Sequence, residues 1–142
     1  DISISDSTGK AIFSLMNGFQ NYIVLTGNKS IVDNKWHQVT VSRDVLNQSI
    51  LLYIDGIIDS IGEAFNYDLT NSADIDVGRY YTGADSYYKG HIDNIRIYNR
   101  TLSDSEVKAL YKKEYPHFEE VQSILTHGGR NWESFKIDKK LI

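Results

Sequence analysis

The sequence predicts an all-β fold, an antiparallel sandwich or barrel, on three observations. Short runs rich in β-branched and aromatic residues recur along the chain, and turn residues end each of them. The single proline, Pro116, lies outside all of these runs, so no predicted strand lacks an amide donor. Only one segment, which begins near Ser103, carries a clear helix start. Regular alternation of strands and helices is therefore disfavoured.

The predicted strands follow one another from residue 11 onward. They cover residues 11–16, 22–25, 36–42, 49–54, 57–61, 75–81 and 91–98. Asp55-Gly56 separates two of the apolar runs, and this dipeptide is typical of a two-residue hairpin turn whose central residues take positive φ. Both arms of this hairpin are apolar at successive positions, which predicts strands that are covered on both faces.

One short helix is predicted over residues 103–112. Ser103 and Glu106 form a capping box: the Ser103 hydroxyl accepts from the Glu106 amide, and the Glu106 side chain returns to the Ser103 amide. An apolar face follows, made by Val107, Leu110 and Tyr111. The Tyr115-Pro116 step limits this helix to about two turns.

Composition bounds the class of protein. The chain has 142 residues, 41% hydrophobic and 24% charged, which suits one globular domain. The net charge of -4 and the absence of a basic stripe argue against nucleic-acid binding. No apolar run approaches the roughly 20 residues that a membrane-spanning helix needs, so no membrane insertion is expected. Ten tyrosines and three Asn-X-Ser/Thr sequons favour an extracellular or cell-surface location.

Four motifs in order resemble one family. Trp36-His37-Gln38-Val39 is similar to the W-H-x-V strand of laminin-G-like domains, and Leu52-Tyr53-Ile54-Asp55-Gly56 to their L-Y-x-D-G hairpin. Val77-Gly78-Arg79 resembles their x-G-R strand, and residues 89–103 resemble their closing segment G-x-I-D-x-[VI]-R-[IV]-Y-N-R-x-L-S. The resemblance implies an antiparallel jelly-roll β-sandwich of the concanavalin A-like superfamily over residues 1–115.

The same resemblance sets expectations for the two ends of the chain. Family domains begin with strands that would precede Asp1, so residues 1–115 are expected to lack the first strands of the jelly roll. An unpaired edge needs a cover. Either the first strands have been trimmed from the chain, or the tail or a second chain, as in a homo-oligomer, is expected to complete the sheet. The tail over residues 116–142 resembles the start of an EAR/EPTP propeller repeat.

A tyrosine-rich segment is the candidate ligand-binding site. Its candidate residues are Tyr80, Tyr81, Asp85, Tyr87 and Tyr88. A tyrosine ring offers a flat apolar face to a sugar ring, and its hydroxyl serves the polar edge. Asp85 would orient ligand hydroxyls or hold a cation. The alternative is that these rings pack on the sheet beside the strands.

Asp93 is the candidate metal ligand. Strand alternation places it on the same face as Ile95 and Ile97, and an inward carboxylate needs a hydrogen bond, an ion pair or a cation. In related jelly rolls the corresponding aspartate binds a structural calcium, so the resemblance implies calcium here. The alternative is a carboxylate held by backbone amides. Trp36 is expected in the core, and His37 is expected to make a hydrogen bond rather than a metal contact.

The leading functional hypothesis is a non-catalytic recognition module that binds a glycan or an extracellular protein. A glycoside hydrolase or lyase is the alternative, and it would present carboxylates on alternate residues of one strand. Asp74-Ile75-Asp76 is the nearest approach to that pattern and lacks a third acid, so no enzyme is expected. The third hypothesis is a structural spacer for an adjoining propeller.

Overall fold

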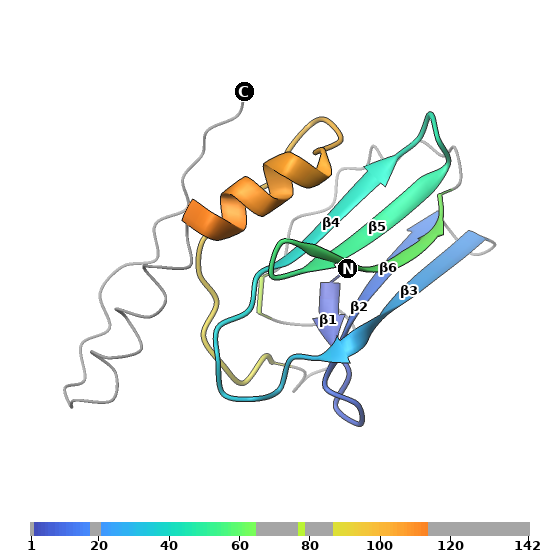
Figure 1. The fold of residues 1–142 in the computed structure, drawn as a ribbon. Helices are drawn as coiled ribbons and strands as arrows, with labels where there is room; N and C mark the ends of the chain where they lie inside the picture. Colours follow the sequence, from blue (N-terminus) through green and yellow to red (C-terminus); the bar gives the residue numbers. More distant parts are fainter. Residues whose placement is uncertain (1, 18–20, 65–76, 79–86, 114–142) are drawn as a thin grey trace. The chain divides into compact units, whose positions relative to one another are not determined.

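The computed structural model describes residues 2–17, 21–64, 77–78 and 87–113 of the chain (Figure 1). The chain divides into two compact units. One unit comprises Asp1–Tyr67 with Arg100–Gly129, and the other comprises Asp68–Asn99 with Arg130–Ile142. All the strands and the helix described below belong to the first unit. The predicted boundary near residue 115 and the expected propeller repeat over 116–142 lie outside the described residues.

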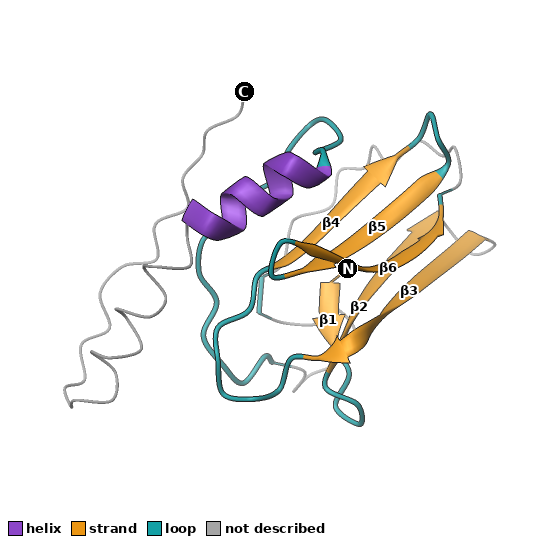
Figure 2. Ribbon diagram, viewed as in Figure 1, coloured by secondary structure: helices purple, strands orange, loops and turns teal. Residues whose placement is uncertain are grey.

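Two three-stranded antiparallel sheets form the first unit (Figure 2). The first sheet has the order β1-β2-β3, with β1 over Ile2–Ile4, β2 over Lys10–Asn17 and β3 over Asn21–Ser30. The second has the order β4-β5-β6, with β4 over Val39–Asp44, β5 over Ser49–Ile54 and β6 over Ile57–Glu63. This all-β architecture with one short helix confirms the predicted fold class.

The core lies between the two sheets and is built by alternation along β5. Ile50, Leu52 and Ile54 are buried and point to the first sheet, where Ala11 and Leu25 complete the same cluster. Burial of one such aliphatic side chain contributes about 1.5–3 kcal/mol. The residues of β5 therefore determine which face of the second sheet is internal.

The other face of β5 carries the helix of residues 104–113. Leu51 and Tyr53 point to this face and pack with Leu102 and Val107, of which Tyr53 and Val107 are almost fully buried. The buried Ser42 hydroxyl donates to the Leu102 carbonyl and accepts from the Leu102 amide, both at 3.2 Å. The expectation that β5 is covered on both faces is therefore correct. No helix among the described residues is long and apolar enough to span a bilayer.

The start of the helix is the predicted capping box. The Ser103 amide donates to Glu106 Oε2 at 2.9 Å, and the Glu106 amide donates to Ser103 Oγ at 3.4 Å. The described part of the helix reaches residue 113, which lies beyond the predicted end at residue 112. The sequence predicted the start of the helix correctly because Ser103 and Glu106, the two residues of the capping box, lie within one turn of each other.

The β5–β6 turn also has the predicted geometry. Asp55 has φ of 56° and Gly56 has φ of 74°, so both central residues are left-handed, and Ile54 pairs with Ile57 across the turn. A methyl group at Gly56 would lie 3.0 Å from Tyr111 Cβ and 3.2 Å from Lys108 Cα. Glycine at this position therefore serves both the turn and the close approach of the helix.

The prediction of a strand over residues 91–98 is wrong, because the structure has no strand there. Asn94 has φ of 52°, a left-handed conformation that breaks strand alternation, and its amide donates to Asp93 Oδ1 at 2.7 Å. Asp93 is exposed instead of facing inward, and Ile97 is 64% exposed. The strand predicted over 75–81 lies outside the described residues except at 77–78, which are not in a strand.

Other boundaries and burial states also differ from the sequence-based expectations. β1 was not predicted, and β4 begins at Val39 rather than at Trp36. Trp36 precedes the strand and is only partly buried, so its placement in the core is wrong. β6 is not covered on both faces, because Ile57 is 68% exposed and Ile61 is 64% exposed. Among the described strands β6 pairs only with β5, so it lies at the edge of its sheet.

Candidate functional site

The carboxylate of Asp55, in the β5–β6 turn, is a hub of hydrogen bonds. Its Oδ2 atom lies 2.8 Å from Lys29 Nζ and 2.9 Å from His37 Nδ1, and its Oδ1 atom accepts from the Gln38 amide at 3.1 Å. The Asp55 amide in turn donates to the Gln38 carbonyl at 2.9 Å. The turn is thereby joined to β3 through Lys29 and to the segment before β4 through His37 and Gln38.

His37 extends this network to the connection between β3 and β4. Its Nε2 atom lies 2.9 Å from Asp33 Oδ1, so the imidazole is placed between two carboxylates. The His37 side chain is only 9% exposed. We name the group Lys29, Asp33, His37 and Asp55 the turn network. The expectation that His37 makes hydrogen bonds is met, since each ring nitrogen has a carboxylate partner.

The turn network shifts the ionisation of its charged members. Burial alone would raise the pKa of Asp55, but hydrogen bonds with Lys29 and His37 outweigh burial and hold that pKa below its usual value. The hydrogen bond to Asp55 raises the pKa of Lys29. The hydrogen bond from His37 lowers the pKa of Asp33. Lys29 and Asp55 therefore form a fully charged pair at neutral pH.

Asp59 of β6 connects the two sheets. Its carboxylate accepts from the backbone amides of Asn28 and Lys29, the latter at 3.1 Å, and the Asn28 side chain donates to the Asp59 carbonyl. Gly27 permits this approach, because a methyl group there would lie 2.7 Å from Asp59 Oδ2 and 3.3 Å from Leu52 Cδ2. These contacts set the spacing of β3 and β6.

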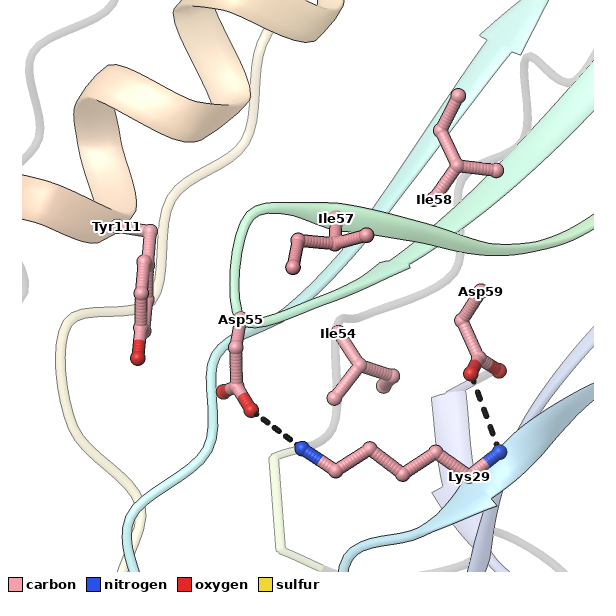
Figure 3. Close-up of a pocket in the computed structure, with 7 residues that line it drawn as sticks. All are labelled: Lys29, Ile54, Asp55, Ile57, Ile58, Asp59 and Tyr111. Atoms are coloured by element: carbon pink, nitrogen blue, oxygen red, sulfur yellow. Dashed lines mark hydrogen bonds and ion pairs between the residues drawn. The ribbon is translucent and has the colours of Figure 1, made fainter.

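A pocket of about 250 Å³ opens beside the turn (Figure 3). Its lining residues come from β3, the β5–β6 hairpin and the helix: Lys29, Ile54, Asp55, Ile57, Ile58, Asp59 and Tyr111. Isoleucine side chains make its apolar wall, and the dashed contacts in Figure 3 join Lys29 to Asp55 and to Asp59. We name this hollow the turn pocket. It combines an aromatic ring, an apolar wall and a charged pair.

A second, more open hollow of about 660 Å³ lies at the start of the helix. Its acidic side chains have partners within the protein: Tyr53 donates to Asp104 Oδ1 at 2.7 Å, and Glu106 binds Arg100 at 2.7 Å. Hydrogen bonding to Arg100 and Ser103 lowers the pKa of Glu106 to about 2. These polar groups fix the helix start.

The predicted tyrosine site is only partly within the described residues. Tyr87 is 61% exposed and Tyr88 is 46% exposed, and the Tyr88 amide donates to the Gly78 carbonyl at 2.8 Å. Tyr80, Tyr81 and Asp85 lie outside the described residues. The tyrosine site therefore stays a prediction. Within it, the structure shows that Tyr87 and Tyr88 are exposed.

The calcium site at Asp93 also stays a prediction. Calcium takes six to eight oxygen ligands, and one oxygen of the Asp93 carboxylate accepts from the Asn94 amide. No group of three or more histidine or acidic side chains suited to a metal occurs within the described ranges.

The turn network was not predicted from the sequence. Trp36-His37 and Asp55-Gly56 were recognised as separate motifs, and Lys29, Asp33 and Asp59 were not singled out. The Asp33–His37 contact spans four positions. The other contacts of the turn network and of Asp59 span 17 to 31 positions of the chain, so no local pattern reveals them. The polar His and Asp within apolar segments were the available signal, because such side chains need partners when buried.

Comparison with known proteins finds one matching family, one similar protein and one solved structure of similar fold. Residues 2–108 match the model of a laminin-G-like family described as the concanavalin A-like lectin/glucanases superfamily. Usherin from Mus musculus is 25% identical, and the match covers 82% of this chain and 2% of usherin.

The crystal structure of an S-layer domain-containing protein from Clostridium thermocellum (residues 221–444) is similar in fold. Its TM-score is 0.52 at 24% identity, and the match covers 72% of this chain and 52% of that one. The chain thus spans a small part of usherin and about half of the S-layer chain.

Proposed function

Because this chain belongs to the concanavalin A-like lectin/glucanase superfamily, we propose that it is an extracellular, non-catalytic recognition module that binds carbohydrate through its tyrosine-rich segment. The observation that carries this proposal is the exposure of Tyr87 and Tyr88 on adjacent positions. An exposed phenol ring presents an apolar face for the C–H groups of a sugar and a hydroxyl for its polar edge. We include Tyr80, Tyr81 and Asp85 of the same segment in the proposed binding site.

Two features of the described carboxylates support a non-catalytic role. A glycosidase needs a general acid with a raised pKa, paired with a second free carboxylate. The pKa of Asp55 is lowered, and its oxygens accept from Lys29, His37 and Gln38. Asp59 accepts from two backbone amides. Both groups therefore serve as structural anchors.

Three sequons support the extracellular part of the proposal. Asn28, Asn47 and Asn99 each begin an Asn-X-Ser/Thr motif, and all three residues are exposed. Glycosylation at a sequon requires a surface position in a secreted protein. Expression through a eukaryotic secretory pathway, followed by mass spectrometry, would measure which of the three asparagines accepts a glycan.

A protein ligand is the second candidate, and a specific observation favours it. Ile57 and Ile61 of β6 are more than half exposed, and exposed apolar side chains on one strand are suited to a protein partner. Such a partner includes a second copy of this chain. A pull-down together with measurement of the oligomeric state would identify this outcome.

A glycan array, read with and without calcium, tests the leading proposal. We expect a saturable signal that Tyr87→Ala and Tyr81→Ala each reduce at least tenfold. Tyr22→Ala is the matched control, because Tyr22 is 62% exposed in β3 and Tyr87 is 61% exposed. An array without signal, or equal losses for Tyr22→Ala and Tyr87→Ala, would contradict the proposal. A blank array would instead favour a protein ligand or a spacer for a propeller repeat.

A further inference from the structure

The turn pocket offers hydrogen-bond donors beyond those that the fold uses. Lys29 has a side chain that is 50% exposed, and its ammonium group carries three N–H donors. Within the described part of the chain, the hydrogen bond of this ammonium is the one to Asp55 at 2.8 Å. The turn network fixes Asp55, so the cation is held in place before any ligand arrives. A ligand that reaches Lys29 therefore meets a preorganised donor.

The opposite side of the pocket is apolar and aromatic. Tyr111 comes from the helix, and Ile57 and Ile58 come from β6 (Figure 3). Ile57 is 68% exposed although its neighbours across the strand pair are buried. An aromatic ring and an aliphatic wall next to charged hydrogen-bonding groups suit a ring with one C–H face and polar edges. A saccharide has this amphipathic character.

The size and charge of the pocket restrict the ligand further. A volume of about 250 Å³ is below the roughly 300–1,000 Å³ of pockets for drug-sized ligands, so one ring fits rather than several. Lys29 supplies one positive charge against the two carboxylates of Asp55 and Asp59, so the pocket has a formal charge of −1. The carboxylates of Asp55 and Asp59 would repel sulfated or acidic sugars, and this repulsion would weaken their binding.

We infer that the turn pocket, with Lys29 as donor and Tyr111 and Ile57 as packing surface, is a second subsite that holds one uncharged saccharide ring. This inference rests on the proposed carbohydrate-binding function and deepens it. The carboxylate of Asp59 keeps its backbone donors and accepts one further hydrogen bond from a ligand hydroxyl. The subsite lies on the first compact unit, separate in sequence from the tyrosine-rich segment of the second.

NMR titration of the isotopically labelled chain tests this inference. The probes are the methyl glycosides of glucose, galactose and mannose, with glucuronic acid and a sulfated N-acetylglucosamine as charged counterparts. We expect saturable amide shifts at Lys29, at residues 55–59 and at Tyr111 with at least one uncharged probe. The charged probes are expected to bind at least tenfold more weakly.

Three variants separate ligand contact from folding. Ile57→Ala and Tyr111→Leu each remove packing surface, and we expect each to reduce affinity at least threefold. Ile61→Ala is the matched control, because Ile61 is 64% exposed on the same strand but does not line the pocket. Lys29→Met should reduce affinity about tenfold or more, as loss of a charge-assisted hydrogen bond does. An unchanged spectrum of unbound Ile57→Ala outside the turn establishes that this variant is folded.

The outcomes for the two proposals differ. Shifts confined to Tyr87, Tyr88 and their neighbours would overturn the subsite and leave carbohydrate recognition standing. Stronger binding of the sulfated probe than of every uncharged probe would overturn the assigned ligand class. Absence of shifts with all probes, together with a blank glycan array, would overturn the proposed function itself.

Discussion

Replacement of Gly56 by alanine tests the contact between the β5–β6 turn and the helix. Gly56 has φ of 74°, and an alanine held in the left-handed region costs about 1–2 kcal/mol. The new methyl group would also lie 3.0 Å from Tyr111 Cβ and 3.2 Å from Lys108 Cα, which are poorly adjustable atoms. Overpacking of this kind costs about 1–3 kcal/mol. The expected loss in free energy of unfolding is therefore about 2–5 kcal/mol.

Gly78→Ala is the matched control for this substitution. Gly78 has φ of 76°, but among the described residues a methyl group there meets only Ile92 Cδ1, at an ordinary 3.7 Å. The control should lose about 1–2 kcal/mol, because it has the backbone cost without the crowding. Urea unfolding followed by circular dichroism measures both free energies. Equal losses for the two variants would refute the packing of the helix on the turn.

Three further results are expected. Leu52→Ala should lower the free energy of unfolding by about 2–5 kcal/mol, because Leu52 is fully buried. Leu46→Ala, at a residue 94% exposed, should stay within about 0.5 kcal/mol in the same urea experiment, and similar losses would contradict the assigned core. The pKa of Glu106 is lowered from 4.5 to about 2, so its contribution to stability is complete above pH 4.5 and is lost as pH falls toward 2. In Glu106→Gln the melting temperature should depend less on pH between pH 4.5 and 2. The same pH dependence in the variant and the wild type would exclude a contribution from Glu106. If calcium binds at Asp93, calcium should raise the melting temperature of the wild type and not of Asp93→Asn, and the absence of any rise would remove the predicted calcium site.

Local sequence signals predicted the parts of the fold whose partners lie close along the chain. Asp55-Gly56 specified the turn because both residues take positive φ, and Ser103 with Glu106 specified the helix start. The strand over 91–98 failed for a local reason as well, since Asn94 adopts φ of 52°. Period-2 hydrophobicity does not register a left-handed residue inside the pattern.

The burial of β6 and the position of the turn pocket depend on tertiary structure, so they were harder to predict from the sequence. Ile57 and Ile61 were predicted to be internal, because the β6 sequence is apolar, yet both side chains are exposed. Likewise, the turn pocket requires Lys29 and Tyr111 to meet beside the same hairpin. Neither feature can be read from composition. The pocket depends on how β3 and the helix lie beside the hairpin, and the exposure depends on which faces of β6 other elements leave uncovered.

Calorimetric titration with a panel of uncharged oligosaccharides, followed by chromatography of the recovered sugar, examines recognition without turnover in one experiment. A saturable heat signal and full recovery of the intact oligosaccharide are the predicted results. Release of shorter sugars, or no saturable heat with any member of the panel, would contradict the account.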